Sequence, residues 1–506
     1  MSQRSWGWIG PLAVAALAFV LRVWDVAKPN RLMFDETYYA KDAWSLTRFG
    51  YVQEFVDNAN SRIVKGHLTD LFTGQPSQIV HPEGGKWMIA LGEWAFGMNP
   101  FGWRIAAVVA GSLTVLVLAR LVRRLTGSTV IGCVAGLLLC FDGLHFVLSR
   151  IALLDVFVAF WIVAAVACLV ADRDWITARL DRVRVFRPWQ LLAGVCFGMA
   201  CATKWNGIYV LAVFGLLVVV WEVLARRHAW RDTPVETRGP RRPGWVMIAL
   251  VTGVPAFVWI VGIAFVVYLV SWTGWLLHHE VYEQRFATPA WGPHVVSPSS
   301  GFLGETRDAL SSLWHYHVMT YDFHTGDYLA GKTHPYESNP LGWLVLARPV
   351  GVDAQNDLPA ASCGAPAASS CMREVLILGN PLIWWTGALA IVVAVVAWMR
   401  TRSWRWSVPV LGVAATWLPW FQYDDRPIFL FYAVAILPFT IIAMCLALRS
   451  IVDAAHTPRT RYLVWLLTGA ALCAVVITFW FFHPVLTDQL ISYDTWMRRM
   501  WFTSWI

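Results

Sequence analysis

Long runs of apolar residues, separated by short polar segments, dominate this chain. A helix that crosses the hydrocarbon core of a bilayer needs about 20 such residues, and eleven stretches reach or approach that length. We expect membrane spans at residues 8–24, 102–121, 128–148, 151–171, 189–203, 206–225, 245–270, 380–399, 407–421, 427–447 and 462–482. No small-residue cleavage site follows the first stretch, so we expect it to be a retained helix. The pattern predicts an all-α, polytopic membrane protein.

Two long polar segments interrupt this pattern, at residues 25–101 and 271–379. Neither shows the alternation of apolar and polar positions that marks strands, so we expect no sheet in them. The spacing at 36–49 and 303–319 instead predicts amphipathic helices lying along the membrane surface. We therefore interpret residues 1–506 as a single transmembrane domain with two large loops.

Arginines predict the orientation. They cluster at 120–124, 173–187, 226–242, 400–405 and 449–461, in alternate connections between the expected spans, whereas the short turns on the other side contain few basic residues. Because cytoplasmic loops carry the excess of Lys and Arg, this pattern predicts a cytoplasmic N-terminus and an extracytoplasmic C-terminus. Both large loops are then extracytoplasmic.

Composition supports a membrane protein and excludes other classes. The chain is 58% hydrophobic and only 14% charged, with a mean hydropathy of +0.53, whereas soluble domains carry about 25% charged residues. A soluble enzyme and a disordered chain are excluded. The net charge of +8 follows from the topological arginines, so we expect no nucleic-acid partner.

Ionisable residues gather at the outer ends of the expected spans, as with Arg104, Asp155 and Lys204. Such residues indicate function by default. A transporter would need polar groups near the midplane, where these spans are apolar. Cations at the outer surface instead suit a lipid phosphate, and a nearby carboxylate could deprotonate a hydroxyl nucleophile.

The first loop supplies a candidate carboxylate in the segment Phe34-Asp35-Glu36-Thr37-Tyr38-Tyr39. An adjacent pair of acids is by itself typical of a solvated loop. Its place in the first outer loop, however, resembles membrane glycosyltransferases of the GT-C class, in which an acidic motif there holds the catalytic base.

The resemblance narrows to the protein O-mannosyltransferase family. The matching elements occur in family order over nearly the whole chain: His81-Pro82-Glu83-Gly84-Gly85-Lys86, Gly102-Trp103-Arg104, Ser149-Arg150-Ile151-Ala152-Leu153-Leu154-Asp155, Thr203-Lys204-Trp205-Asn206-Gly207 and His334-Pro335-Tyr336-Glu337-Ser338. The family usually has a second proline where this chain has Glu83. The second large loop is too short for the β-rich lumenal module of the eukaryotic enzymes, which indicates the bacterial, actinobacterial-type form.

This resemblance implies roles for individual residues. Asp35 would be the general base, and Glu36 would bind substrate or orient the loop. The donor phosphate would be bound by Arg104, Lys204 and Lys86. The resemblance also implies a role in substrate binding or loop organisation for His81, Arg150, Asp155, His334, Glu337 and Ser338.

The resemblance also implies the reaction. The donor is a polyprenyl (dolichyl-type) phosphate mannose, the acceptor is a Ser or Thr hydroxyl of an exported polypeptide near the translocon, and the anomeric carbon is inverted. No nucleotide cofactor is required, because the lipid phosphate activates the sugar. No metal site is expected, since His278-His279-Glu280 lacks the spacing of a zinc site; metal dependence stays open.

Three alternatives remain open. One is another GT-C transferase that moves arabinose or aminoarabinose from a lipid phosphate onto envelope glycan or lipid. The others, from different classes, are a membrane transporter and a non-catalytic scaffold. Separately, Cys363 and Cys371 in the second loop are spaced closely enough for a disulfide if that loop faces an oxidising compartment.

Overall fold

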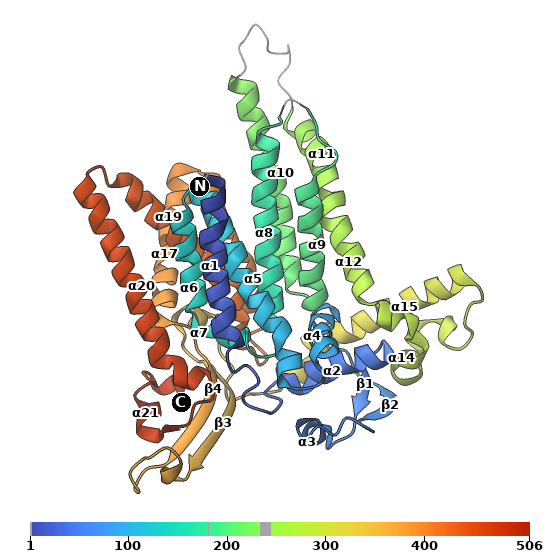
Figure 1. Cartoon of the computed structure of the whole chain (residues 1–506). Helices are drawn as coiled ribbons and strands as arrows, with labels where there is room; N and C mark the ends of the chain where they lie inside the picture. The colour runs from blue at the N-terminus through green and yellow to red at the C-terminus, as the bar shows by residue number, and fades with distance from the viewer. Residues whose placement is uncertain (1–2, 181, 233–243) are drawn as a thin grey trace.

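The protein is a bundle of long helices with the two chain ends at opposite ends of the bundle (Figure 1). The computed structural model describes residues 3–180, 182–232 and 244–506. The arginines at 238, 241 and 242, which contribute to the predicted orientation, lie outside the described residues. Each expected span overlaps a helix, although only the second half of 427–447 lies in α19. The helices are α1 (Gln3–Val23), α5 (Pro100–Thr126), α6 (Thr129–Cys140) with α7 (Gly143–Leu148), α8 (Asp155–Thr177), α9 (Pro188–Thr203), α10 (Gly207–Asp232), α11 (Trp245–Ala256) with α12 (Ile263–Ser271), α17 (Pro381–Thr401), α18 (Trp404–Trp417), α19 (Leu437–Ala454) and α20 (Pro458–Leu486).

Helix length alone supports fewer crossings than the eleven expected. Among the described residues, seven helical segments are long and apolar enough to cross a bilayer, and three shorter apolar helices accompany them. The third expected span is divided because Asp142 ends one helix and caps the next, accepting a hydrogen bond from the backbone N–H of His145 at 2.9 Å. The fold is thus a mostly helical membrane bundle, and the span count stays a prediction.

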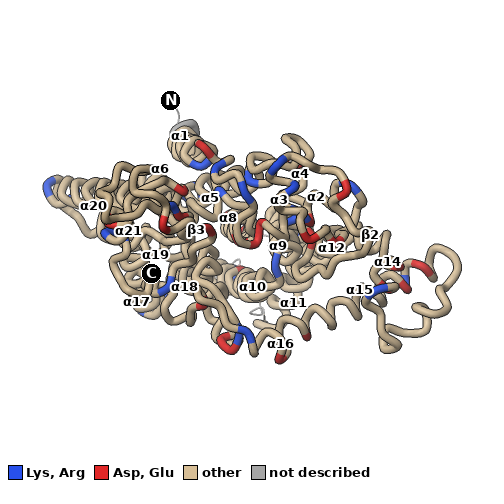
Figure 2. The backbone as a smooth tube through the Cα atoms, turned by 90° about the horizontal axis from the view of Figure 1, so that it is seen from below, with Lys and Arg blue, Asp and Glu red and all other residues tan. Residues whose placement is uncertain are grey.

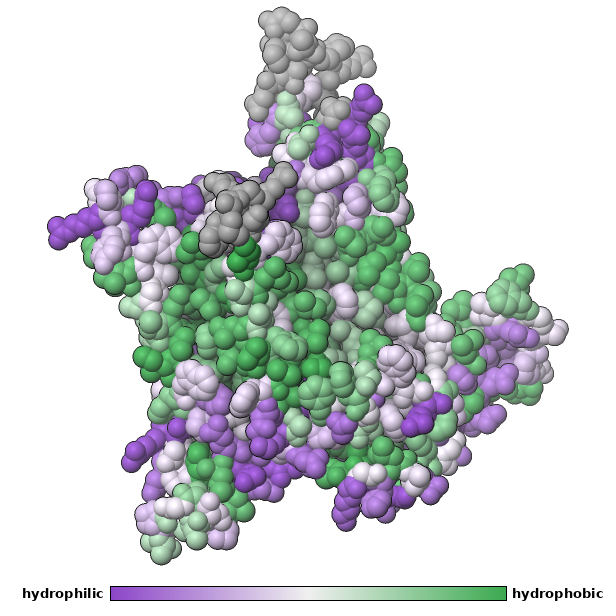
Figure 3. Space-filling model, viewed as in Figure 1, coloured by the Kyte–Doolittle hydropathy of each residue, from purple (hydrophilic) through white to green (hydrophobic). Residues whose placement is uncertain are grey.

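On the face shown in Figure 3, an apolar belt crosses the bundle at mid-height, with polar residues above and below it. Side chains such as Phe265, Val392 and Leu467 point outward from the spans and are exposed. A continuous buried core joins residues from both halves of the chain, from Val14 to Trp505. The belt is the surface that a bilayer would cover.

Both large loops fold at the end of the bundle that also holds the C-terminus (Figure 1). They form α2 (Glu36–Phe49), α3 (Ala59–Val64) and α4 (Gly84–Phe96) from the first loop, and α13 (Thr273–Leu277), α14 (His279–Phe286), α15 (Phe302–Thr325) and α16 (Asp327–Ala330) from the second. The two segments expected to be amphipathic are therefore helical. A last short helix, α21 (Tyr493–Met497), follows α20.

The expectation that the loops contain no strands is wrong. In the first loop β1 (Gln53–Phe55) pairs antiparallel with β2 (Phe72–Pro76). A second sheet has the order β3 (Val350–Leu358), β4 (Cys371–Ile377), β5 (Ile491–Ser492), all antiparallel. The central strand β4 is buried on both faces, so its sequence lacks the alternation by which a half-exposed strand is recognised.

A disulfide joins Cys363 to Cys371 near the tip of the β3–β4 hairpin. It closes a loop of few residues and ties the start of β4 to the turn that precedes it. Midway along β4, Glu374 accepts a hydrogen bond from the indole N–H of Trp496 in α21 at 2.7 Å, which holds the hairpin against the C-terminal segment.

Candidate active site

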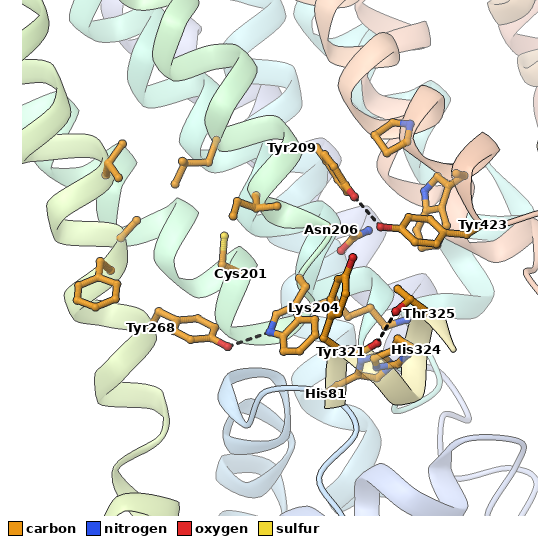
Figure 4. A pocket seen from close by; sticks show the side chains of 18 of the residues that line it. His81, Cys201, Lys204, Asn206, Tyr209, Tyr268, Tyr321, His324, Thr325 and Tyr423 are labelled. Atoms are coloured by element: carbon orange, nitrogen blue, oxygen red, sulfur yellow. Dashed lines mark hydrogen bonds between the residues drawn. The ribbon is translucent and has the colours of Figure 1, made fainter. Parts of the chain in front are cut away.

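A cavity of about 530 Å³ lies where the outer ends of the spans meet the second loop. Its walls are largely apolar side chains of α10 and α12, and residues of α15 cover the end nearest the loops (Figure 4). Polar groups collect at that end. The residues that line the cavity are His81, Cys201, Lys204, Trp205, Asn206, Ile208, Tyr209, Leu211, Val261, Ala264, Phe265, Tyr268, Tyr321, His324, Thr325, Pro419, Trp420, Tyr423 and Arg426.

Lys204 places an ammonium group in this cavity. It stands in extended conformation directly after α9 ends, in the break before α10 begins. Its Nζ donates to both carboxylate oxygens of Asp155, at 2.9 and 2.8 Å, and lies 4.7 Å from the centre of the Tyr432 ring. Asp155 is the first residue of α8, and through this ion pair it orients Lys204.

Asp35 lies at the start of α2, next to Phe34, whose φ of 46° turns the chain sharply. Its side chain is half-buried, and the Tyr39 hydroxyl lies 3.4 Å from its Oδ2. Burial raises the pKa of Asp35 to about 6, against the opposing charge of Lys204, while the negative charge of Asp155 adds to the increase. A carboxylate that titrates near neutral pH is suited to accept a proton during turnover.

Glu36 and Arg104 form a closed pair, a contact that the sequence did not indicate. Both side chains are fully buried, and two guanidinium nitrogens of Arg104 donate to the two Glu36 oxygens at 2.8 and 2.9 Å. The other N–H groups of Arg104 donate hydrogen bonds to the carbonyls of Val26, Pro29 and Arg31. With these contacts every N–H of Arg104 is engaged, so it holds the loop and has no donor left for a phosphate.

Glu36 is equally occupied. Besides Arg104, its carboxylate accepts the backbone N–H of Met33 and of Ala152, both at 2.9 Å. It thereby fixes the turn that presents Asp35 and joins that turn to the segment before α8. Of the two roles left open for Glu36, the geometry supports loop orientation.

Lys86, expected to bind the donor phosphate, and Arg150, expected to bind substrate or organise a loop, also contact the protein itself. Lys86 is buried in α4 and pairs with Asp42 of α2 at 2.8 Å, away from the cavity lining. Arg150 donates to the carbonyls of Arg22 and Trp24 and so caps the end of α1. Charges at helix ends look alike in a sequence whether they bind carbonyls or ligands.

The remaining predicted residues divide between the cavity and a supporting turn. His81 lines the cavity and stacks on His324, with ring centres 5.3 Å apart. His334 packs edge-on against Phe34 and Phe429 beside the acidic motif. Glu337 accepts the backbone N–H of His334 at 3.0 Å, and Ser338 accepts the indole N–H of Trp343 at 2.9 Å, so both shape this turn.

The sequence-based reasoning missed Arg426 and His324. Arg426 donates to His324 Nδ1 at 3.1 Å, and His324 Nε2 donates to the carbonyl of Val80 at 2.9 Å. Burial lowers the pKa of His324 to about 4, and the Arg426 charge acts in the same direction, so the ring is neutral. Among the described residues, Nε of Arg426 has no hydrogen-bond partner. Arg426 was visible only as a basic residue in a short outer turn.

Glu83, where the family usually has proline, is buried at the N-terminus of α4. Neither of its oxygens has a hydrogen-bond partner in the described part of the chain. Burial raises its pKa to about 8, despite Lys86 nearby. The side chain lies where the first loop meets α13, since a Cβ on Gly274 would stand 3.4 Å from Glu83 Oε2.

Replacing Glu83 with Gln is expected to raise the melting temperature more at pH 8 than at pH 5. The folded protein holds the proton up to about pH 8, whereas the unfolded chain releases it near the ordinary pKa, so stability falls as pH rises through this window. Gln does not titrate and removes a dependence of at most about 1.4 kcal/mol per pH unit. Thermal unfolding of the purified protein at both pH values measures this, with Glu305→Gln on exposed α15 as control. An equal shift at both pH values would contradict it.

No arrangement of three or more His, Cys, Asp or Glu side chains that could hold a metal ion is present in residues 3–180, 182–232 and 244–506. His279, from the His-His-Glu segment, pairs with Glu283 at 2.9 Å. Seen from the loop end, basic and acidic positions alternate around α2, α4, α5 and α8 (Figure 2), as the pairs Lys86–Asp42, Arg104–Glu36 and Lys204–Asp155 require.

The fold is that of a membrane glycosyltransferase of the GT-C class. The S. cerevisiae protein O-mannosyltransferase Pmt1–Pmt2 complex bound to the sugar donor is similar in structure, with a TM-score of 0.71 over 98% of this chain and 92% of that chain, at 14% identity. The sequence profile described as dolichyl-phosphate-mannose-protein mannosyltransferase matches residues 12–282, and that of the C-terminal four-transmembrane region of protein O-mannosyltransferase matches 309–505. The chain belongs to this family, which confirms the resemblance noted in its motifs.

Curated relatives agree over the full length. The chain is 35% identical to a polyprenol-phosphate-mannose–protein mannosyltransferase of Mycolicibacterium smegmatis, covering 99% of this chain and 94% of the relative. It is 34% identical to a protein of the same name from Mycobacterium tuberculosis, covering 99% and 92%. An undecaprenyl phosphate-aminoarabinose transferase of Pseudomonas aeruginosa is similar over only 30% of this chain. The mannosyltransferase interpretation is therefore favoured over the arabinose alternative.

Proposed function

We propose that the protein transfers mannose from a polyprenyl phosphate to Ser or Thr hydroxyls of exported polypeptides. One observation carries this proposal: an apolar cavity at the outer ends of the spans terminates in Lys204 and Arg426, and the charge of Lys204 also acts on Asp35. The apolar walls suit a prenyl chain, the cations suit its phosphate, and Asp35 suits the acceptor hydroxyl.

In the proposed reaction, the Asp35 carboxylate takes the hydroxyl proton as the acceptor oxygen forms a bond to the anomeric carbon. The bond from that carbon to the phosphate oxygen breaks, and the lipid phosphate leaves as an anion, with inversion. Lys204 and Arg426 stabilise the charge that builds on the leaving group. Because the leaving group departs as an anion, no acid need protonate it, and we propose no nucleotide or other cofactor.

Orphaned polar atoms support a sugar subsite beside these cations. Oδ1 of Asn206, which lines the cavity next to Lys204, has no hydrogen-bond partner among the described residues. The hydroxyls of Tyr209 and Tyr423 face one another at 3.0 Å across the same cavity (Figure 4). Such groups could exchange their present contacts for sugar hydroxyls.

The deciding experiment is direct transfer. Purified protein in lipid nanodiscs is incubated with radiolabelled polyprenyl phosphate mannose and a Ser/Thr-rich peptide, and the labelled peptide is counted. We expect mannosyl-peptide and free polyprenyl phosphate in equal amounts. Transfer from polyprenyl phosphate arabinose but not mannose would overturn the proposal in favour of the arabinose alternative.

Replacing Arg426 with Ala is expected to weaken donor binding by about 10- to 100-fold, the effect of losing a hydrogen bond to a charged group. The measurement is the Kd for polyprenyl phosphate by titration in nanodiscs. Arg498→Ala, which removes an exposed guanidinium near α21, is the matched control. Unchanged affinity in a folded Arg426→Ala protein would leave Lys204 as the cation that binds the phosphate.

We further propose that the N-terminus is cytoplasmic and that the cavity and both loops face the extracytoplasmic side. The two termini lie at opposite ends of the bundle, and the loops share the end that holds the C-terminus, which supports this orientation (Figure 1). Acceptors emerging from the translocon would then meet the site directly.

The disulfide provides a test of this orientation. On intact cells, an impermeant maleimide should label Cys363 and Cys371 only after an impermeant reductant is added, because the pair is oxidised and faces outward. A Cys363→Ser/Cys371→Ser protein is the negative control. Labelling only after the membrane is permeabilised would reverse the proposed orientation.

A further inference from the structure

Helix α15 has two apolar faces. One packs inside the protein: Leu313 and Tyr316 are buried, and the Tyr316 ring lies 5.4 Å from that of Trp275. The other face is exposed and carries a row of large side chains at helical spacing, which we call the α15 stripe. It consists of Leu303, Leu310, Trp314, Val318 and Tyr321, with exposed fractions of 81, 42, 67, 42 and 55%.

The α15 stripe reaches the cavity, because its last member, Tyr321, lines the cavity together with Val261, Ala264 and Phe265 of the membrane-spanning segment. One turn further along α15, His324 and Thr325 line the same cavity. The helix extends sideways from the lower ends of the spans (Figure 1).

Lipid-facing residues lead continuously from the spans toward this helix. Phe265, Val266 and Val270 of α12 are exposed, and Leu277 at the end of α13 is 74% exposed. The part of the molecule that projects sideways carries apolar surface at the level of the lower part of the belt (Figure 3). An apolar surface of this extent, continuous with a membrane belt, is typical of contact with lipid.

The residue types and charges agree with an interfacial position. Trp314 and Tyr321 are of the kind that gathers at headgroup level, where an apolar ring and a polar edge are both accommodated. Arg307 is the charged residue that falls on the stripe side, at the end distant from the cavity, and its side chain is 78% exposed. An arginine there can reach lipid phosphates while the stripe stays in the apolar layer.

We propose that the α15 stripe inserts into the headgroup–acyl boundary of the outer leaflet, where it forms the floor of a lateral entrance through which the lipid donor reaches the cavity. The proposal rests on the proposed function and adds a partner to that site, the bilayer surface itself. The depth of α15 in the leaflet then sets the height at which His324 and Arg426 meet the donor phosphate.

The inner side of α15 supplies a connection to the other cation. His317 lies 2.6 Å from the Tyr268 hydroxyl, which accepts the indole N–H of Trp205 at 2.8 Å, and the His317 and Trp205 rings stack. Trp205 directly follows Lys204. A shift of α15 in the leaflet would therefore reach both Arg426 and Lys204.

Depth measurements test the insertion. Spin labels are placed on Leu310→Cys, Trp314→Cys and Val318→Cys in a Cys473→Ser background, which removes the exposed free thiol. Collision rates with oxygen and with a water-soluble nickel chelate are measured in nanodiscs. Labels at the stripe should favour oxygen by several-fold over the controls Thr306→Cys and Asp322→Cys, which flank it on the polar side.

Two outcomes would overturn the proposal. Nickel access at the stripe equal to that at the controls would place this face in water, where it would be free for an acceptor polypeptide. Spin–spin broadening between labelled molecules at the stripe would assign it to a second copy of the chain. Neither the collision rates nor the spin–spin broadening depends on mannose transfer. Both measurements can therefore be interpreted even if the proposed function is wrong.

A transfer assay tests the entrance. A Leu310→Glu/Trp314→Glu protein should lose at least 10-fold in transfer from a long-chain polyprenyl phosphate mannose in nanodiscs, yet keep transfer from a short-chain, water-soluble analogue. Thr306→Glu is the matched control for added charge. Equal losses with both donors would contradict a role in membrane entry and indicate that the substitutions disturb the site itself.

Discussion

Replacing Asp35 with Asn is expected to lower kcat by about 100-fold or more while donor affinity stays unchanged. Asn is nearly isosteric but cannot accept the hydroxyl proton, and a general base typically contributes two to four decades of rate. The donor phosphate is bound elsewhere, at Lys204 and Arg426, so its Kd should not move. Transfer rates and polyprenyl phosphate binding, measured on the same preparation, separate the two effects.

The pH dependence follows from the same carboxylate. Because the pKa of Asp35 is raised to about 6, the group is largely protonated and inactive at pH 5 and largely ionised at pH 7. The rate should rise with pH through about 6 and then level off. The control is Asp25→Asn, an acid of the same loop that pairs with Lys28 at the surface. Native turnover in a folded Asp35→Asn protein would refute the mechanism.

Replacing Arg104 with Lys should destabilise the fold by about 2–6 kcal/mol, because Lys has three donors against five for Arg and each buried acceptor left without a partner costs about 1–3 kcal/mol. Lys keeps the charge but cannot form the fork to Glu36 and also satisfy three backbone carbonyls. The measurements are folded yield and melting temperature, with Arg498→Lys as the control. Donor affinity per folded molecule should be unchanged, because no Arg104 donor is free to reach the cavity.

Melting temperature and donor affinity together distinguish a structural role of Arg104 from the phosphate-binding role that its motif implies. If a folded Arg104→Lys protein has a native melting temperature but has lost donor binding, Arg104 contacts the phosphate as its place in the family pattern implies. Loss of stability without loss of affinity identifies it as the residue that holds the acidic turn.

The sequence predicted the helices well because length and apolarity are properties of a single segment. It also indicated Lys204, which stands in a short break between two helices and lines the cavity in the structure. It could not indicate the contacts of Arg104, Lys86 and Arg150, whose partners are backbone carbonyls or acids distant in the chain. Arg426 was missed because its place at the cavity depends on a contact with His324, which lies about a hundred residues away in the sequence. The two residues meet only when the second loop is folded.

The strands were missed for a related reason. β4 is buried along nearly its whole length, and its two charged residues, Arg373 and Glu374, stand next to each other, so the strand carries no period of two. β5 has only two residues, which pair with β4 because the chain that follows α20 passes along the edge of that strand. Neither property can be derived from local sequence.

The cavity opens toward the belt, where Ile208 and Phe265 are more than half exposed. A substrate that arrives through such an opening is dissolved in two dimensions, and its supply depends on its share of the surrounding lipid. Adding buffer at a fixed lipid composition leaves that share unchanged, whereas adding detergent or carrier lipid reduces it. The KM for the donor should therefore be expressed as a mole fraction of the lipid and detergent. A KM expressed as a molar concentration would change with the detergent content even when the protein is the same.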